Sequence, residues 1–230
     1  MTVKTLSVIV PAYNERATIE VALRRLYAVP LPTGWMREVV VVDDGSTDGT
    51  GAVLESVRQP FGFVLERRAR NAGKGAAVRV GIARARGTHV LIQDADLEYD
   101  PADIPALLMA IDAGADAVFG VRDRKLHSGY LLYRIGATVL GAALYAVSGA
   151  AVRDFYTGYK LLPLPLLRSL ALESDGFELE AEITCKLLAR GVRIVSVPVS
   201  YAPRSFADGK KIGPRDALRG LAALWKWRRG

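Results

Sequence analysis

Residues 38–46 read Glu-Val-Val-Val-Val-Asp-Asp-Gly-Ser, so a run of four valines ends in two acidic residues and a turn sequence. β-Branched residues favour strands, and a short apolar run bounded by turn residues is typical of a strand buried in a sheet. In open α/β sheets, ligands bind beyond the carboxyl ends of the strands. The stretch therefore indicates an α/β fold whose binding site lies beside Asp43 and Asp44.

The same alternation extends over the first half of the chain. Short β-branched runs predict strands at Ser7–Val10, Glu38–Val42, Phe63–Glu66, His89–Gln93 and Ala117–Gly120. Patterns between these runs predict helices at Glu15–Ala28, Thr50–Arg58, Gly75–Ala85 and Pro101–Ala113. Strands that alternate with helices are typical of βαβ units stacked into a mainly parallel sheet flanked by helices.

Two carboxylates follow the apolar run His89–Gln93 in the sequence Asp94-Ala95-Asp96. At the end of a strand, such a pair can supply oxygen ligands to Mg²⁺ or Mn²⁺, and the cation can bridge the oxygens of a nucleotide diphosphate. An isolated Asp-x-Asp is equally typical of a solvated turn. We favour the metal-binding interpretation of Asp94 and Asp96, because polar clusters also follow other predicted strands.

One of these clusters is Pro-Ala-Tyr-Asn-Glu at 11–15, directly after the first predicted strand. Another is Asn-Ala-Gly-Lys-Gly at 71–75, directly before a predicted helix. Glycines let the backbone approach a ligand, Lys74 offers a point charge, and a helix N-terminus favours phosphate. The clusters together predict a binding edge for a phosphate-containing ligand.

Two other motifs are excluded by their context. The acidic spacing from Asp44 to Glu55 resembles an EF-hand loop, but the valines before it favour a strand where an EF-hand needs a helix. Gly73-Lys74-Gly75 lacks the upstream glycine and the following Ser or Thr of a Walker A loop. Neither calcium binding of the EF-hand type nor nucleoside-triphosphatase activity is supported.

The composition narrows the class of partner and the compartment. Half of the 230 residues are apolar, which allows a sizeable core, and the net charge of +7 favours an anionic partner. Cys185 is the single cysteine, so no intramolecular disulfide can form. The short apolar stretch Leu6–Val10 does not resemble an export signal. We expect a cytoplasmic protein.

Six motifs resemble those of inverting family 2 glycosyltransferases, in particular the polyprenyl-phosphate (dolichyl-phosphate) mannosyl- and glucosyltransferases. In chain order they are Pro-Ala-Tyr-Asn-Glu (11–15), Asp-Asp-Gly-Ser (43–46), Asn-x-Gly-Lys-Gly (71–75), Asp-Ala-Asp (94–96), Gly-Val-Arg (120–122) and Arg-Asp-x-x-Thr-Gly-Tyr-Lys (153–160). The resemblance implies a single GT-A domain over residues 1–230. Residues 1–125 would bind the nucleotide-sugar, and residues 126–230 would bind the acceptor.

The resemblance also implies roles for individual residues. A metal-dependent hexosyltransferase of this kind would hold Mg²⁺ or Mn²⁺ on Asp96 and Asp94, while Arg122 and Arg204 stabilise the charge of the leaving group. The residues that would bind the donor are Pro11, Ala12, Tyr13, Glu15, Asp43, Asp44, Lys74, Asp94, Ala95 and Lys210. Glu98 departs from the family pattern, because many lipid-phosphate mannosyltransferases carry Gln at that place.

Two glutamates bear on the acceptor. Glu180 and Glu182 belong to the sequence Gly-Phe-Glu-Leu-Glu-Ala-Glu at 176–182, which resembles an acidic pair of the dolichyl-phosphate glucosyltransferases. A hydroxyl acceptor needs a carboxylate base, whereas a phosphate acceptor is already anionic. We interpret the pair first as organising the site and second as a base. The expected donor is of the GDP-mannose or UDP-glucose type, and the expected acceptor is a polyprenyl phosphate.

Two apolar segments in the second half suggest contact with a membrane. Residues 130–152 contain Arg134 as their one charged residue, but they are rich in Gly and Ala and have basic residues on both sides. A membrane span, a core helix and an interfacial helix are the alternatives, and we favour the interfacial helix. Near the C-terminus, a helix after Pro214 would present Leu218, Leu221, Ala222 and Trp225 on one face, beside the basic Arg219, Lys226, Arg228 and Arg229. This second helix either packs on the sheet or docks on the membrane surface.

Other functions stay open on the sequence alone. A family 2 enzyme with a saccharide or other hydroxyl acceptor is the nearest alternative. A nucleotidyltransferase shares paired aspartates on a doubly wound sheet, and a non-catalytic protein could bind anionic surfaces through the basic C-terminal helix. We expect peripheral contact with the inner face of the membrane and no binding to nucleic acid.

Overall fold

The computed structural model describes residues 3–122, 131–204 and 214–228. In this part of the chain, seven strands form one sheet in the order β3-β2-β1-β4-β6-β5-β7. The strands are β1 (Lys4–Ala12), β2 (Trp35–Asp43), β3 (Val64–Arg67), β4 (His89–Ile92), β5 (Ala117–Arg122), β6 (Lys160–Pro163) and β7 (Ile194–Val199). β6 runs antiparallel to β4 and β5, while all other neighbours are parallel.

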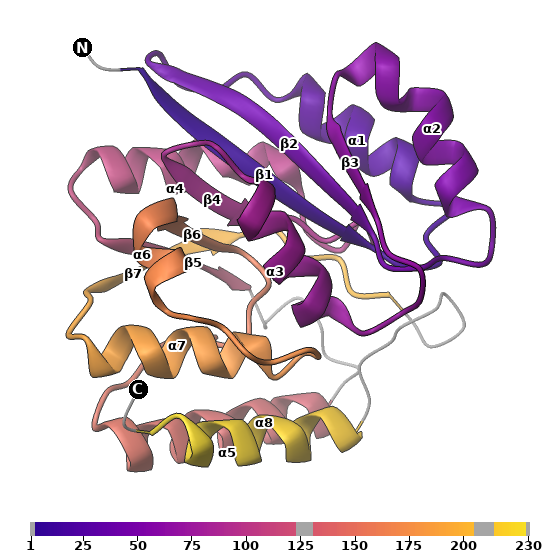
Figure 1. Ribbon diagram of the computed structural model, residues 1–230. Helices are drawn as coiled ribbons and strands as arrows, with labels where there is room; N and C mark the ends of the chain where they lie inside the picture. Colours follow the sequence, from indigo (N-terminus) through magenta and orange to yellow (C-terminus); the bar gives the residue numbers. More distant parts are fainter. Residues whose placement is uncertain (1–2, 123–130, 205–213, 229–230) are drawn as a thin grey trace.

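Helices cover both faces of the sheet (Figure 1). α1 (Ile19–Ala28), α2 (Thr50–Phe61) and α4 (Ile104–Asp112, preceded by the 3₁₀ helix η1, Pro101–Asp103) share one apolar core with the sheet. α3 (Lys74–Arg84), α6 (Leu164–Ser169) and α7 (Leu179–Ala189) share the core on the opposite face. The result is a three-layer α/β/α sandwich, which is the arrangement that alternating strands and helices favour.

Burial on both faces explains the unbroken apolar runs of the central strands. On β1, Val8 packs into the core beneath α1 while its neighbour Ile9 packs against α3, and both side chains are fully buried. Parallel strands that are covered on both faces show such continuous apolar sequences. Gly81 lets α3 lie directly on β1, since a Cβ at this position would be 2.4 Å from the Ile9 side chain.

The five strands expected in the first half of the chain are confirmed, and His89 begins β4 as expected. The helix expected at Glu15 is wrong at its start, because α1 begins at Ile19. Asn14 has a φ of 51°, and the Glu15 side chain bonds to Thr18 and Arg204 instead of facing solvent on a helix. The sequence patterns also did not predict β6 and β7.

The remaining helices, α5 (Leu131–Ser148) and α8 (Pro214–Lys226), form a separate layer against α7, below the sandwich in Figure 1. Leu140 and Leu144 of α5, Cys185 of α7 and Leu224 of α8 share one apolar core. Neither these two helices nor any other helix of the described residues combines the length and the hydropathy needed to cross a bilayer.

The packed face of α8 agrees only in part with the expected one, because Leu221 packs in this core while Leu218 and Trp225 do not. Ala223 and Leu224 face α5 and α7, and Trp227 directly after the helix packs there as well. Leu218 and Trp225, which were expected on the packing or docking face, are 67% and 64% exposed. α8 therefore packs on other helices rather than on the sheet, and it leaves a second set of apolar side chains in solvent.

Candidate functional site

A cavity of about 330 Å³ opens at the carboxyl ends of β1 and β4. Its walls come from eight parts of the chain. They are the end of β1 with the loop after it, the residue after β2, the loop before α3 with the start of that helix, the segment after β4, the end of β5, the segment before β6, the start of α7 and the segment after β7. These segments are far apart in the sequence, so the fold brings most of the expected site residues into one place. Parallel strands achieve this because their carboxyl ends share one edge of the sheet.

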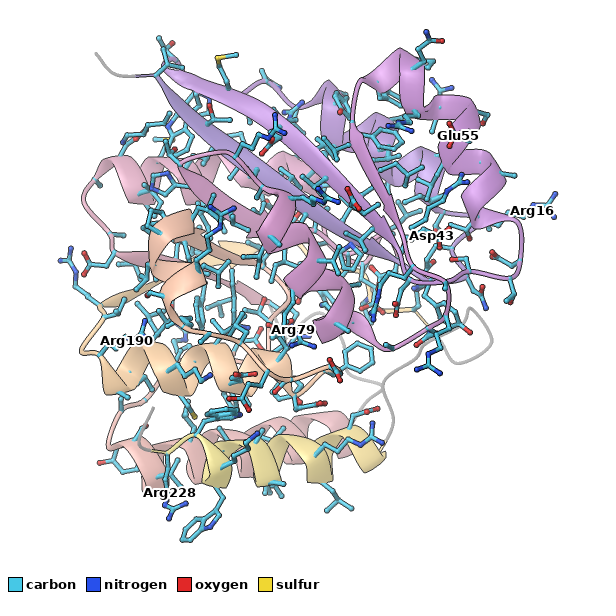
Figure 2. The ribbon with its side chains drawn as sticks, viewed as in Figure 1. Arg16, Asp43, Glu55, Arg79, Arg190 and Arg228 are labelled. Carbon is cyan, nitrogen blue, oxygen red and sulfur yellow. The ribbon has the colours of Figure 1, made fainter. Side chains whose placement is uncertain are left out.

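The loops after β1 and β2 are locked together by hydrogen bonds. The Asn14 backbone N–H donates to Ser46 Oγ (3.0 Å), and the Thr47 N–H donates to Asn14 Oδ1 (2.8 Å). Asp43 accepts the Ser46 N–H (3.0 Å) and so shapes the turn, without lining the cavity itself. Figure 2 shows Asp43 at this edge of the sheet, with Arg16 on the neighbouring loop pointing away from it.

Asp44 ties the third loop to the same edge. Its buried carboxylate accepts hydrogen bonds from the backbone N–H groups of Ala72 (3.1 Å) and Gly73 (2.8 Å). It also forms an ion pair with Arg68 (2.8 Å). Gly45 is needed beside it, because the φ of 71° is left-handed and a Cβ would lie 2.6 Å from the Arg70 backbone. Asp44 thus holds the 71–75 loop at the cavity wall.

A chain of ion pairs leads from the cavity wall into the core. Lys74 Nζ contacts both oxygens of Asp94, at 2.8 and 2.9 Å, and lies 3.3 Å from Glu180 Oε1. Lys160 is fully buried and contacts Glu180 Oε2 at 2.5 Å. The two lysines hold the pKa of the Glu180 carboxyl below its usual value although burial opposes this. Glu180 is therefore a stable anion and a weak base.

Asp96 lies close to two other carboxylates at this edge. Burial, followed by the nearby charges of Asp94 and Glu98, raises the pKa of the Asp96 carboxyl to about 7. Arg204 approaches Asp96 Oδ2 at 3.4 Å and only partly offsets these effects. Ionising Asp96 beside two other carboxylates is costly, and a bound divalent cation would offset the repulsion between their negative charges.

Arg204 is positioned by two glutamates on different segments. Glu15 accepts hydrogen bonds from the Nη1 and Nη2 atoms of Arg204, at 3.1 and 2.9 Å, and Glu98 accepts the Arg204 backbone N–H at 2.8 Å. Glu98 also accepts the hydroxyl of Tyr201 at 2.7 Å. The segment after β7 is thus fastened over the edge of the cavity, and Glu98 acts here as the anchor.

Arg122 is fixed at the end of β5 by Asp154. The Asp154 carboxylate accepts the Arg122 backbone N–H and two guanidinium nitrogens, at 3.0, 2.8 and 2.6 Å. Asp154 and the neighbouring tyrosines raise the pKa of Arg122 against the effect of burial, so its positive charge is secure. A bidentate arginine of this kind offers a fixed cation to a phosphate.

The structure brings most of the expected residues to the cavity, with three exceptions. The residues that line it are Pro11, Ala12, Tyr13, Glu15, Asp44, Lys74, Asp94, Ala95, Asp96, Arg122, Glu180 and Arg204. Asp43 does not line the cavity, and Lys210 lies outside the described residues.

Glu182 is the third exception. Its carboxylate is fully buried and accepts Lys186 Nζ (2.6 Å) and the backbone N–H groups of Glu173 (2.9 Å) and Ser174 (2.8 Å). The two backbone bonds hold the loop before α7, the Lys186 bond lies within α7, and Glu182 does not line the cavity. The structure therefore separates the two members of the acidic pair, and only Glu180 is placed to meet a ligand.

Sequence reasoning assigned no role to Tyr156, Phe177 and Tyr201, which also line the cavity. Tyr156 occupies an unspecified position of the motif at 153–160, and Phe177 precedes the acidic pair. In the sequence, the one indication that these three residues belong to the site is that each lies within a family motif or within a few positions of a residue expected to bind the ligand.

The donor set fits a divalent cation bound together with a diphosphate. Among the described residues, no three His, Cys, Asp or Glu side chains converge to hold a metal by themselves. Asp96 and Asp94 would supply hard oxygen ligands, and the diphosphate would complete the coordination. Asp94 can take part because each carboxylate oxygen has more than one lone pair, so contact with Lys74 leaves acceptor capacity.

The sheet order and the position of the cavity define a GT-A-like α/β protein. A family model described as glycosyl transferase family 2 matches residues 7–161. The chain belongs to this family, as its motifs indicated, and it is therefore a glycosyltransferase.

Relatives with curated names support the same family. Polyprenol monophosphomannose synthase of Mycolicibacterium smegmatis is 31% identical over 228 residues, which cover 90% of this chain and 80% of that protein. Glycosyltransferase AglJ of Haloferax volcanii is 29% identical over 96% of this chain and 71% of its own length. An undecaprenyl-phosphate 4-deoxy-4-formamido-L-arabinose transferase of Klebsiella pneumoniae is 28% identical over 90% of this chain, which spans 63% of that relative.

Solved structures show the same fold. Glucosyl-3-phosphoglycerate synthase of Mycobacterium tuberculosis superposes with a TM-score of 0.73 at 26% identity, over 99% of this chain and 81% of that chain. A complex of that enzyme with Mn²⁺, UDP-glucose and phosphoglyceric acid gives a TM-score of 0.74 at 22% identity, over 98% and 80% of the two chains.

Proposed function

We propose that this glycosyltransferase moves a hexose from a nucleotide-sugar to a polyprenyl phosphate at the surface of a membrane, with inversion at the anomeric carbon and with Mg²⁺ or Mn²⁺ as cofactor. The observation that carries the proposal is the pairing, in one cavity, of the Asp94 and Asp96 carboxylates with the fixed cations of Arg122 and Arg204. The first pair suits a cation on a diphosphate, and the second suits a phosphate.

The donor side is supported by the walls of the cavity. Pro11 to Glu15 and the 71–75 loop form a preorganised edge at which a nucleoside diphosphate would bind. A divalent cation on Asp96 would neutralise the charge that develops on the departing diphosphate. The M. tuberculosis synthase, which has the same fold, was solved in complex with Mn²⁺ and UDP-glucose. This supports a nucleotide-sugar as the donor.

The acceptor side is supported by the poor basicity of Glu180. A hydroxyl acceptor must lose its proton during attack and so needs a base. The Glu180 carboxylate is paired with Lys74 and Lys160, and its lowered pKa makes it a weak one. A phosphate acceptor needs no base, and Arg122 and Arg204 would offset its repulsion from the donor diphosphate. Names of relatives such as polyprenol monophosphomannose synthase agree with this acceptor.

A surface for the membrane is offered by the outer sides of α5 and α8. Val139 and Tyr145 of α5 and Leu218 and Trp225 of α8 are each at least half exposed. Arg228 lies over the Trp225 ring at 4.0 Å, and Figure 2 shows Arg228 at the outer side of this helix layer. Exposed aromatic and aliphatic side chains beside a basic residue are typical of helices that lie in the membrane interface.

Sugar transfer to a short-chain polyprenyl phosphate tests the proposal directly. We expect a sugar-phosphate-lipid product from either UDP-glucose or GDP-mannose in the presence of Mn²⁺, and no product with a chelator. Phosphoglyceric acid and a free saccharide serve as parallel acceptors. Transfer to one of these alone would contradict the lipid acceptor while leaving the donor side intact, and no transfer from any nucleotide-sugar would contradict the whole proposal.

A further inference from the structure

Two buried polar atoms at one end of the cavity have no hydrogen-bond partner among the described residues. They are the hydroxyl of Tyr156 and Oε1 of Glu180, and both side chains line the cavity. Leaving a buried polar group unpaired costs free energy, and native proteins rarely do so without a reason. Two such atoms in one binding cavity indicate that a ligand completes their hydrogen bonds.

Glu180 is built to present one oxygen to the cavity. Lys160 Nζ holds Oε2 at 2.5 Å and also donates to the backbone carbonyl of Thr157 at 2.5 Å. Oε1 has only the more distant ion pair with Lys74 at 3.3 Å. Glu180 is 2% exposed, so its carboxylate depends on partners within the cavity rather than on bulk solvent. The result is a fixed, charged acceptor of hydrogen bonds.

Tyr156 is built to present its hydroxyl to the same end. Its ring packs edge-on against Phe155, and α8 passes so close that a Cβ on Gly220 would lie 3.0 Å from the Tyr156 hydroxyl. Burial, and then the charges of Glu180 and Glu178, raise the pKa of the Tyr156 phenol, so it stays protonated. The hydroxyl can therefore both donate and accept.

The charge of this end selects the chemistry of the ligand. Glu180, Glu178 and Asp216 act on Tyr156 as negative charges and Lys74 acts as a positive one, so the groups around the phenol are mainly hydrogen-bond acceptors. A neutral hydroxyl can donate to the Glu180 carboxylate and accept from the Tyr156 phenol at once. Phe177 lines the same cavity and adds an apolar ring face. A polyol with several hydroxyls on one face is the ligand that these groups suit.

We propose that Tyr156 and Glu180 bind hydroxyl groups of the hexose that is transferred, and that Tyr156 thereby contributes to the choice of donor sugar. This inference rests on the proposed function, because it requires a nucleotide-sugar donor in this cavity. It assigns the end of the cavity beside Tyr156 and Glu180 to the sugar and leaves Arg122 and Arg204 for the phosphates.

Calorimetric titration of Tyr156→Phe with Mn²⁺ and either UDP-glucose or UDP tests the inference, with GDP-mannose and GDP as the second pair of probes. For the pair that the wild type binds, we expect the affinity for the nucleotide-sugar to fall about fivefold, as loss of one hydrogen bond predicts. The affinity for the free diphosphate should not change. Tyr27→Phe, in which the altered ring stacks on Phe61 of α2, is the matched control and should change neither affinity.

Donors that lack single sugar hydroxyls sharpen the test. For the hydroxyl that Tyr156 binds, the deoxy donor should bind wild type and Tyr156→Phe equally well, because the two changes remove the same bond. The melting temperature of Tyr156→Phe should not fall, since the lost hydroxyl has no partner in the protein.

The outcomes separate the two levels of the argument. If the wild type binds neither nucleotide-sugar, the proposed function fails and the inference fails with it. If the wild type binds a nucleotide-sugar and Tyr156→Phe binds it with the same affinity, the inference is overturned while the proposed function stands. An equal loss of affinity for the nucleotide-sugar and for the free diphosphate would overturn it as well.

Discussion

The loop edge of the sheet and the outer helix layer of α5 and α8 are held together by different forces. At the edge, Asp44 alone accepts two backbone N–H groups and an arginine, and Asn14 bonds the loop after β2 through both backbone and side chain. In the helix layer, Leu144, Leu224 and Trp227 pack as apolar side chains. Hydrogen bonds fix position closely, whereas apolar packing is non-directional.

This difference teaches which part of the molecule does which task. A preorganised polar edge suits a ligand whose charges must be met at fixed points, as those of a diphosphate must. The helix layer buries one apolar face and exposes another at Leu218 and Trp225, which suits a partner without fixed shape, such as a lipid surface.

The largest effect is expected at the polar edge, from Asp96→Ala. We expect the kcat/KM for sugar transfer to fall about 1,000-fold, because the carboxylate that would hold the cation at the leaving group is lost. Release of the nucleoside diphosphate measures the rate. Asp116→Asn, which changes an exposed carboxylate 3.9 Å from Arg193, is the control and should keep full activity. Unchanged activity of Asp96→Ala in the presence of a chelator would remove the metal role.

The next largest effect is expected in the helix layer, where replacing either of two tryptophans should change the free energy of unfolding by different amounts. Trp227 is 8% exposed and lies beneath Lys186 Nζ at 3.7 Å, so Trp227→Ala should lower the free energy of unfolding by about 3 kcal/mol. Trp225 is 64% exposed, so Trp225→Ala should change it by less than about 0.5 kcal/mol.

Trp225→Ala should affect binding to vesicles that contain anionic lipid, although it hardly affects stability, because Trp225 faces outward. Trp225→Ala should weaken this binding, and sedimentation with the vesicles measures it. Vesicle binding that is as strong in Trp225→Ala as in the wild type would contradict the assignment of this surface.

The smallest effect concerns pH and again the polar edge. Because the folded-state pKa of Asp96 is about 7 and thus above its unfolded value, the metal-free protein loses stability as the pH rises through 7. Mn²⁺ competes with this proton, so its affinity should be about tenfold lower at pH 6 than at pH 7.5 and above. Titration followed by the electron paramagnetic resonance of free Mn²⁺ measures it. The same pH dependence in Asp96→Asn would assign the proton to another group.

The sequence predicts the polar edge better than the helix layer for a physical reason. β1, β2 and β4 are buried on both faces, so their apolar runs and the polar residues after them identify both fold and site. This reasoning does not find β6, because that strand has four residues and contains the buried Lys160, which forms an ion pair with Glu180 from α7.

The face of α8 could not be predicted for a related reason. Its sequence is apolar on two sides, at Leu218 and Trp225 and at Ala223 and Leu224. Periodicity cannot choose between two such sides, and only the packing against α5 and α7 decides. The separation of Glu180 from Glu182 is likewise a tertiary effect, since Lys186 and the 173–174 loop take up the second carboxylate.

Thermal unfolding with a panel of nucleotide-sugars and Mn²⁺ tests most directly whether the polar edge binds a metal-bridged diphosphate. A ligand that binds only the folded state raises the melting temperature, and it does so more strongly the tighter it binds. We expect a clear rise for one nucleotide-sugar together with Mn²⁺, a smaller rise for either alone, and no added effect of Mn²⁺ in Asp96→Ala. No rise with any nucleotide-sugar, or an equal rise in Asp96→Ala, would contradict the account.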